Sequence, residues 1–132
     1  MKNKIYLAAP WLDRELMPER AKVFEDAGFT ITHKWWEYEG ESQENESEEF
    51  LRECAASDFN GVTTADVLIA FNTAKSEGKA TEQGIALASK VPIISINPPV
   101  KVTSNIFHHL PQYTHVNSIE EALEEVKKIC HQ

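Results

Sequence analysis

The sequence predicts an α/β domain in which five parallel strands form a doubly wound sheet flanked by helices. Apolar runs of strand length alternate along the chain with longer segments of helical pattern, which is typical of repeated strand–helix units. The inner runs are apolar at consecutive positions, as expected for strands buried on both faces of a parallel sheet. A chain of 132 residues suits one such domain, so we expect a single domain over residues 1–132.

Five segments are expected to form the strands. The first, Lys4–Ala9, is continuously apolar after its lysine and ends at Pro10. The second, Phe29–Trp36, alternates apolar and polar residues, which predicts an edge strand with its two tryptophans on opposite sides. The other strands are expected at Ala65–Phe71, Val91–Ile96 and Tyr113–Val116.

The segments between these strands are expected to form helices. A helix over Glu15–Ala27 would end at Gly28, because glycine favours the backbone conformation of a helix C-terminus. A helix over Ser118–Ile129 would begin with a capping box made by Ser118 and Glu121. Further helices are expected at Glu48–Ala56, at Gly78–Ser89 and, as a short one, within Thr103–Leu110.

Charge and hydropathy exclude several classes of partner. The formal net charge of −8 argues against a nucleic-acid polymer, because neutralising its phosphates requires a basic face. No apolar run approaches the roughly 20 residues of a membrane helix. The apolar stretch near the N-terminus is too short for the core of a signal peptide. We therefore expect a cytoplasmic protein that binds neither nucleic-acid polymers nor membranes.

The segment Glu37–Glu49 is the most biased part of the chain, with seven glutamates and no basic residue. Two interpretations remain open for it. The segment is either a solvated loop that leads into a helix or a lid that covers a pocket.

Open parallel sheets bind ligands beyond the carboxyl ends of their strands, where the strand order reverses. The common glycine-rich nucleotide motifs and histidine spacings for zinc are absent, so we expect neither a metal nor a cofactor. Glu82 and Asp58 are the two acids near expected strand ends that lie outside a charged run. Two converging carboxylates suit the cleavage of a glycosidic bond. The alternative for Glu82 is an ordinary first-turn acid that faces the helix dipole.

Four short stretches in a fixed order resemble a known family. They are IYLAAPW at 5–11, DFNGV at 58–62 followed by Ala65-Asp66, GKATEQGIA at 78–86, and SNI at 104–106. Together they span most of the chain from Lys4 to Asn105 and are similar to the nucleoside 2-deoxyribosyltransferase family. That family includes a branch of 2′-deoxynucleoside 5′-monophosphate N-glycosidases. The resemblance implies a flavodoxin-like fold.

The resemblance also implies a role for each matched residue. Glu82 would be the nucleophile that attacks C1′ of the deoxyribose, and Asp58 would assist at the base or sugar. Tyr6 would hold the carboxylate of Glu82 by a hydrogen bond. Ala8 and Gly78 would leave room for the sugar, because small side chains let a ligand approach the backbone.

The substrate implied by the resemblance stays open between two classes. Ser76 and Ser104 suit a 5′-phosphate, whereas Asn105 is similar to the residue that receives an uncharged 5′-hydroxyl in a neighbouring subunit's site. The acidic segment would repel a phosphate if it covers the pocket. Trp11 and Trp36 either pack within the protein or stack on the nucleobase.

The resulting hypothesis is an enzyme that cleaves the N-glycosidic bond of 2′-deoxynucleosides through a covalent intermediate on Glu82. It would transfer the deoxyribosyl group to a free nucleobase. Its alternatives are hydrolysis of 2′-deoxynucleoside 5′-monophosphates and a nucleotide-binding module without catalysis. The family's shared sites further imply a homo-oligomer.

Overall fold

Five parallel strands form the centre of the molecule, in the order β2–β1–β3–β4–β5. The computed structural model describes residues 2–38, 46–98 and 101–131. The strands are β1 (Lys4–Ala8), β2 (Thr30–Ile31), β3 (Val67–Phe71), β4 (Ile93–Ile96) and β5 (Tyr113–Val116). The predicted doubly wound parallel sheet is confirmed.

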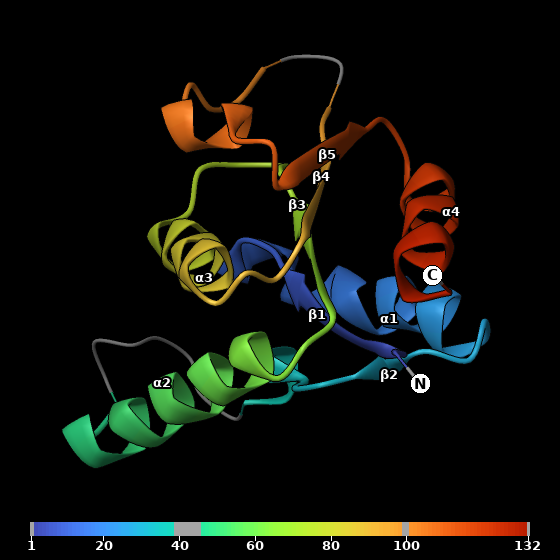
Figure 1. Ribbon diagram of the computed structural model, residues 1–132. Helices are drawn as coiled ribbons and strands as arrows, with labels where there is room; N and C mark the ends of the chain where they lie inside the picture. The colour runs from blue at the N-terminus through green and yellow to red at the C-terminus, as the bar shows by residue number, and fades with distance from the viewer. Residues whose placement is uncertain (1, 39–45, 99–100, 132) are drawn as a thin grey trace.

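Helices cover both faces of this sheet, α2 and α3 on one face and α1 and α4 on the other (Figure 1). The bounds are α1 (Met17–Glu25), α2 (Glu48–Thr63), α3 (Glu77–Ala88) and α4 (Ile119–Cys130), with 3-10 turns η1 (Trp11–Leu16), η2 (Trp35–Glu37) and η4 (Ile106–His109). At the start of α4 the Ser118 side chain accepts from the Glu121 amide at 3.1 Å, as the expected capping box requires, while the Glu121 carboxylate accepts from the Asn117 amide at 2.8 Å. In the described part of the chain, no helix is long and apolar enough to cross a membrane.

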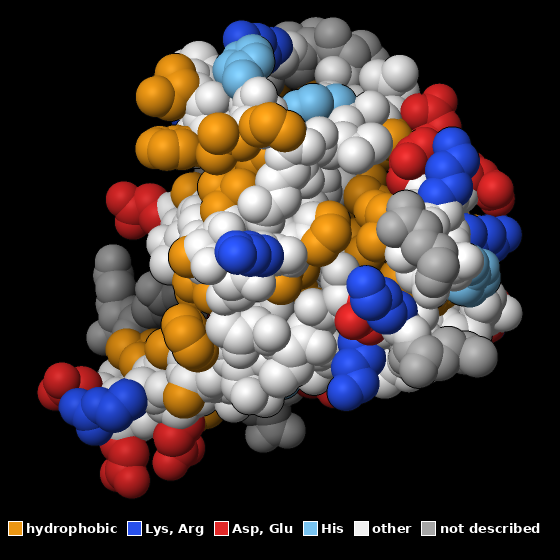
Figure 2. Space-filling model, in the orientation of Figure 1, with side chains coloured by type: hydrophobic (Ala, Val, Ile, Leu, Met, Phe, Trp, Pro, Cys, Tyr) orange, Lys and Arg blue, Asp and Glu red, His pale blue; other side chains and the backbone are white. Residues whose placement is uncertain are grey.

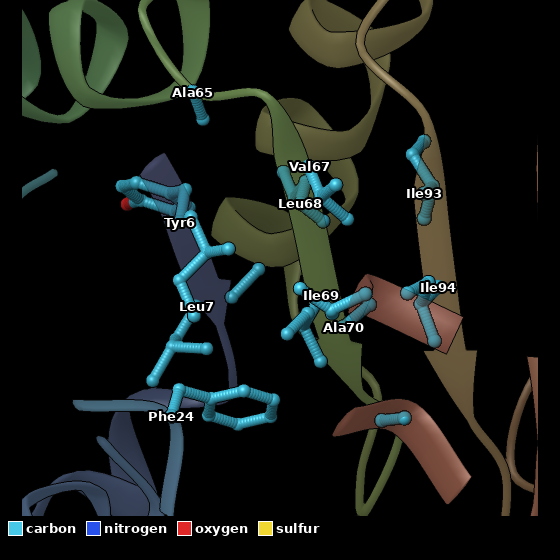
Figure 3. Packing of buried hydrophobic residues seen from close by; sticks show 14 of the residues in the cluster. Tyr6, Leu7, Phe24, Ala65, Val67, Leu68, Ile69, Ala70, Ile93 and Ile94 are labelled. Atoms are coloured by element: carbon cyan, nitrogen blue, oxygen red, sulfur yellow. The ribbon is translucent and has the colours of Figure 1, made fainter. Parts of the chain in front are cut away.

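The core lies between the sheet and its helices and is built mainly from the three central strands. Figure 3 shows side chains of β1, β3 and β4 packed side by side, with Phe24 of α1 beneath them. The sheet register places Tyr6 beside Leu68 and Ala8 beside Ala70. These strands are buried at almost every position, which explains why their sequences are apolar without alternation.

The strand order reverses between β1 and β3. From β1 the chain passes through α1 to β2 on one side, and the later strands extend on the other side. Doubly wound sheets bind their ligands beyond the carboxyl ends of the two strands at such a reversal, which here are β1 and β3. Tyr6 is the middle residue of β1, and α3 follows β3 after a five-residue connection.

The predicted edge strand Phe29–Trp36 is wrong beyond Ile31. The chain leaves the sheet after β2 and forms the turn η2, in which Trp35 is buried. Its indole N–H donates to the Leu7 carbonyl at 2.7 Å, so the ring gains a buried polar partner that a continued strand would not offer. Trp36 packs edge-on against Trp35 instead of occupying the opposite face of a strand.

Several helix boundaries differ from expectation, and two of these changes concern candidate site residues. Helix α2 continues to Thr63 and not to Ala56, so Asp58 lies within a helix. Helix α3 begins at Glu77, which makes Glu82 its sixth residue. Residues 39–45 of the acidic segment lie outside the described residues, and the choice between loop and lid therefore stays a prediction.

Gly61 allows α2 to lie close to β1. A Cβ atom at this position would lie 2.9 Å from the His33 Cβ and 3.1 Å from two carbons of the Tyr6 ring. Both distances are shorter than ordinary packing contacts, and the atoms belong to parts of side chains that have little freedom to move. The glycine of the DFNGV stretch is therefore required by the packing of Tyr6.

We expect Gly61→Ala to destabilise the fold by about 1–3 kcal/mol, as overpacked core substitutions do. Gly84→Ala is the matched control, because a Cβ at Gly84 meets no atom within 4 Å. That change should be neutral or stabilise α3 by up to about 1 kcal/mol, since alanine is the better helix former. Urea unfolding of both variants measures the difference. Equal midpoints would contradict the proposed packing role of Gly61.

Candidate functional site

Tyr6 and Glu82 meet between β1 and α3, and the hydroxyl of Tyr6 donates a hydrogen bond to Oε2 of Glu82. Tyr6 is completely buried, and Glu82 is partly buried beside the inward-facing positions of α3, which are Lys79, Gln83 and Ala86. The contact predicted from the resemblance is therefore present in the structure. Because Glu82 is the sixth residue of α3, it also lies beyond the first turn, where the helix dipole has most of its effect.

The surroundings of Glu82 favour its neutral form. Burial raises its pKa to about 8, the hydrogen bond from Tyr6 opposes this rise, and the charge of Asp58 adds to it. Burial also raises the pKa of Tyr6 far above its usual range, with Glu82 and Asp58 contributing. Tyr6 therefore stays a hydrogen-bond donor at every working pH, and Glu82 holds a proton in most molecules at pH 7.

Asp58 reaches the same region from α2, and its carboxylate lies in a group of polar side chains. The Tyr38 hydroxyl donates to Oδ1 of Asp58 at 3.0 Å, and the His33 Nε2 lies 3.4 Å from the same oxygen. Burial raises the pKa of Asp58, while the hydrogen bond from Tyr38 and the nearby His33 oppose the rise. The charge of Asp58 acts on both Tyr6 and Glu82. The structure thus brings together the three residues predicted to be catalytic.

The start of α3 holds two further predicted site residues. Ser76 caps the helix, and its hydroxyl oxygen accepts from the Lys79 amide at 3.2 Å. Gly78 is exposed in the first turn, and a Cβ there would come no closer than 3.9 Å to the Ser76 hydroxyl. No contact among the residues that the structure describes requires a glycine at position 78, which is consistent with the predicted close approach of a ligand.

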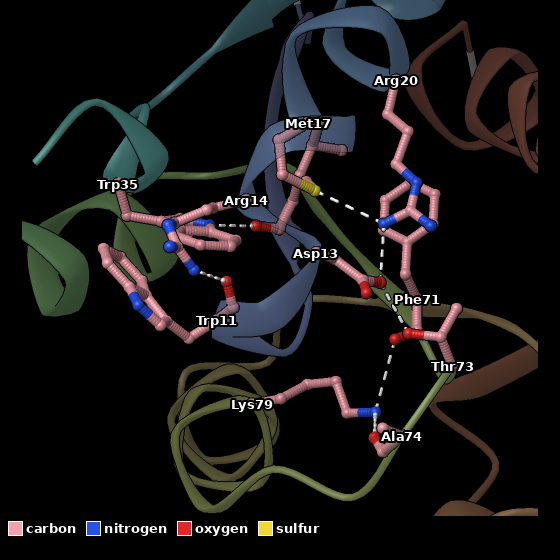
Figure 4. A network of polar contacts seen from close by, with 11 residues as sticks. Trp11, Asp13, Arg14, Met17, Arg20, Trp35, Phe71, Thr73, Ala74 and Lys79 are labelled. Carbon is pink, nitrogen blue, oxygen red and sulfur yellow. Dashed lines mark hydrogen bonds and ion pairs between the residues drawn. The ribbon is translucent and has the colours of Figure 1, made fainter. Parts of the chain in front are cut away.

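A polar network joins the loop after β1 to the loop after β3 (Figure 4). Asp13 accepts from Thr73 at 2.6 Å and pairs with Arg20 at 3.0 Å. Lys79 is buried and donates to the carbonyls of Phe71 and Ala74 at 3.3 and 2.8 Å. Burial lowers the pKa of Lys79 to about 8, and Asp13 opposes this change. These contacts fix the start of α3 against the carboxyl ends of both strands.

Trp11 and Trp36 both pack against Trp35, with ring centroids 6.0 and 5.5 Å apart. Trp36 also lines a surface hollow of about 410 Å³ together with Arg14, Glu15 and Tyr38. This hollow is not lined by Tyr6, Asp58 or Glu82. The structure therefore supports packing for both tryptophans, and stacking of either on a nucleobase stays a prediction.

Ala8 and Asn105 are the remaining predicted site residues. Ala8 has no exposed surface, so a ligand could touch it only after its neighbours moved. Asn105 caps η4, where its side-chain oxygen accepts from the Phe107 amide at 3.0 Å. Among the described residues, no hydrogen bond joins Asn105 to Tyr6, Asp58 or Glu82. Its predicted contribution to a neighbouring subunit's site stays a prediction.

Hydrophobic side chains gather on the surface over η4 and continue toward α3 and α2 (Figure 2). The large exposed ones on these elements include Ile106 and Phe107 of η4 and Phe59 of α2, which are 75%, 56% and 55% exposed. Such a surface is compatible with the predicted homo-oligomer. Oligomerisation stays a prediction.

Sequence reasoning did not find His33, Tyr38 or Lys79. His33 and Tyr38 lie in irregular backbone after β2, where neither helical nor strand periodicity indicates which side chains point inward. Lys79 interrupts the apolar side of a helix, which was a usable signal, because a lysine at a buried helical position is rarely left without polar partners. No cluster of three or more metal-ligating side chains occurs in the residues that the structure describes.

Comparison with known proteins identifies the fold. No family model and no curated protein sequence matches the chain. The CMP N-glycosidase BcmB of Clostridium botulinum matches with a TM-score of 0.65 at 18% identity, over 95% of this chain and 99% of that one. A conserved protein of Enterococcus faecalis V583 matches with a TM-score of 0.65 at 18% identity, over 97% and 99%. BlsM matches with 0.62 at 17% identity, over 98% and 90%.

All three share the fold of this chain. At 17 to 18% identity the likeness shows the fold alone, and it extends over nearly the whole length of each protein. The flavodoxin-like fold that the family resemblance implied is confirmed.

The raised pKa of Glu82 predicts a pH-dependent difference in stability between the protein and Glu82→Gln. The folded state holds the Glu82 proton up to about pH 8, whereas the unfolded chain releases it near pH 4.5. Stability from this group is therefore fully present below about pH 4.5 and is lost as the pH rises through 8. The variant does not titrate, so it should gain a few kcal/mol relative to the wild type across this window, at about 1.4 kcal/mol per pKa unit.

Thermal unfolding from pH 4.5 to 9 measures this effect. The difference in Tm between Glu82→Gln and wild type should grow with pH and level off above pH 8. Glu124→Gln is the control, because Glu124 lies at the surface of α4 and pairs with Lys127. Parallel curves for Glu82→Gln and wild type would show that the Glu82 carboxyl is not perturbed.

Proposed function

We propose that this chain cleaves the N-glycosidic bond of a nucleoside or nucleotide, with Glu82 attacking C1′ of the sugar. The observation that carries the proposal is the Glu82 carboxyl, held by Tyr6 at the carboxyl end of the sheet with Asp58 nearby. One protein of the same fold is a CMP N-glycosidase, which supports this class of reaction. A carboxylate beneath an oxocarbenium-like carbon stabilises its positive charge and then bonds to it.

The proton on Glu82 has a place in this reaction. Glu82 must lose one proton before it attacks, and the leaving base must gain one proton to depart as a neutral molecule. Asp58 is the group that passes this proton from Glu82 to the base. The bond between C1′ and the base nitrogen breaks, and a bond between C1′ and a Glu82 oxygen forms. Tyr6 keeps its proton and donates to the second Glu82 oxygen throughout.

The second half of the reaction decides between transfer and hydrolysis. When a free nucleobase attacks C1′, its N–H proton passes to Asp58, the deoxyribosyl group moves to the new base and Glu82 leaves as a carboxylate. When water attacks instead, Asp58 takes a proton from the water, and the products are free base and free sugar. In both cases Asp58 then returns the proton to Glu82. Following the resemblance, we propose 2′-deoxynucleosides as donors and transfer to another base as the outcome.

Hydrolysis of nucleoside 5′-monophosphates is the second candidate, and the start of α3 favours it. The first amide groups of a helix have no partner inside the helix and suit an anion, and here Ser76 and Gly78 lie beside them. The fold neighbour BcmB acts on a 5′-monophosphate, CMP. Against this candidate stands Glu77, an exposed carboxylate in the same first turn.

One assay separates these reactions. The protein is incubated with each 2′-deoxynucleoside, its 5′-monophosphate and CMP, with and without a second free base, and the products are followed by chromatography. Exchange of bases indicates transfer, whereas free base that forms regardless of the acceptor indicates hydrolysis. Complete absence of turnover would favour the binding module.

We expect Glu82→Gln to lower kcat by at least about a thousandfold, because it removes the attacking group while retaining an acceptor for Tyr6. Glu120→Gln is the matched control, since Glu120 is an exposed glutamate in the first turn of α4. Initial rates under saturating substrate measure both. Full activity of Glu82→Gln would rule out the proposed attack by Glu82.

A further inference from the structure

His33, Tyr38 and Asp58 form a short chain of polar contacts beside the site. The His33 Nε2 lies 2.7 Å from the Tyr38 hydroxyl oxygen, and that oxygen lies 3.0 Å from Oδ1 of Asp58. The same hydroxyl lies 3.0 Å from the Cys54 carbonyl oxygen. Tyr38 thus faces one ring nitrogen and two oxygens, and neither His33 nor Tyr38 takes part in the bond changes of the proposed reaction.

The hydroxyl of Tyr38 has a single proton to donate, and this constrains the arrangement. Both the Asp58 carboxylate and the Cys54 carbonyl can only accept, so one of them receives the proton at any moment. When His33 carries hydrogen on Nε2, it donates to the Tyr38 oxygen, and the phenol proton is then directed to one of those two oxygens. An ionised Asp58 is the better acceptor, because hydrogen bonds to charged groups are about twice as strong as neutral ones.

The surroundings hold these rings in position. The Tyr38 ring packs edge-on against Phe50 of α2, with centroids 6.2 Å apart, and lies 5.4 Å from the His33 ring. The His33 backbone follows Thr32, whose hydroxyl donates to the Gly61 carbonyl at 2.7 Å. Contacts to α2 therefore fix His33 and Tyr38 relative to Asp58 before any substrate binds.

We propose that Tyr38 and His33 are positioning residues for Asp58 in the proposed N-glycosidase reaction. Tyr38 donates to Oδ1 while Asp58 is ionised, and turns to the Cys54 carbonyl when Asp58 takes up a proton. Asp58 therefore accepts and returns its proton at Oδ2. Tyr38 and His33 neither gain nor lose a proton in the cycle; they set the orientation of Asp58 and favour its ionised form. The role in catalysis rests on the proposed function.

The charged and titratable groups that face Asp58 come from several elements. Tyr6 of β1 and Glu82 of α3 lie on the site side, and Cys54 lies one turn earlier on α2. His33 and Tyr38 come from the segment after β2. Of these groups, only Tyr38 and His33 favour the carboxylate form of Asp58, and burial opposes it. Removing the Tyr38 hydroxyl should therefore raise the pKa of Asp58.

Tyr38→Phe and His33→Gln test this inference through the pKa of Asp58 itself. The chain has four aspartates, so ¹³C labelling of aspartate carboxyls gives few signals, and Asp58→Asn assigns the relevant one. We expect Tyr38→Phe to raise the pKa of Asp58 by about one unit or more. His33→Gln keeps an N–H donor but cannot carry a charge, so it should cause a smaller rise. Tyr113→Phe is the control. It also removes a tyrosine hydroxyl, but that hydroxyl donates to Gln83 at 2.7 Å and not to Asp58.

Turnover of the same variants tests the catalytic part. If Asp58 must be ionised in the free enzyme, the ascending limb of kcat/KM against pH moves to higher pH in Tyr38→Phe. At a pH on that limb, kcat/KM should fall about tenfold, while Tyr113→Phe keeps the wild-type profile. His33→Gln serves as a second variant if Tyr38→Phe does not fold.

The outcomes separate this inference from the proposed function. An Asp58 pKa that is the same in wild type, Tyr38→Phe and His33→Gln overturns the inference, whatever the turnover. A pKa that rises while the pH profile stays unchanged overturns the positioning role in catalysis. Absence of turnover in the wild type overturns the proposed function. The titration of Asp58 in the variants then still tests whether Tyr38 and His33 favour its ionised form.

Discussion

The hydrogen bond from Tyr6 to Glu82 is the contact on which the candidate site depends. A carboxyl and a phenol hydroxyl placed at the edge of an apolar core are each costly without a polar partner, and here each serves the other. The geometry of this pair is set by packing well away from the two oxygens. Tyr6 is fixed on β1 by its pairing with β3, and Gly61 of α2 leaves the space that its ring occupies. A change in that packing would therefore alter the position of the Glu82 carboxyl.

The sheet topology explains why this pair lies at a site and not merely in the core. β1 and β3 are neighbours at which the strand order reverses. The chain beyond β1 therefore continues to α1 on one face of the sheet, and the chain beyond β3 continues to α3 on the other face. The contacts of Asp13 with Thr73 and of Lys79 with the carbonyls after β3 hold these loops and the start of α3 together. Helix α3 thus presents its first turn and Glu82 toward the same end of the sheet.

The sequence was sufficient for the sheet and for most helices, because buried parallel strands and capped helices have local signatures. It was insufficient for α2 beyond Ala56, where Asp58, Asn60 and Gly61 are weak helix formers that tertiary packing retains in the helix. The order of the family-like stretches predicted that Tyr6 and Glu82 meet, although they are 76 residues apart. His33 and Tyr38 could not be predicted in this way, because their places are set by irregular backbone and by contacts with α2.

The two carboxyls of the site differ in their polar partners, and this difference supports the separate roles proposed for them. Among the described residues, Glu82 accepts from one donor, Tyr6, and burial together with the charge of Asp58 raises its pKa to about 8. Asp58 has Tyr38 and His33 beside it, and both oppose the rise that burial causes. When the environments of two acids push their pKa values apart, one can hold a proton while the other is charged. In the proposed reaction, the proton held by Glu82 is the one that the leaving base requires, and Asp58 is the acid whose polar partners favour the charged form that receives it.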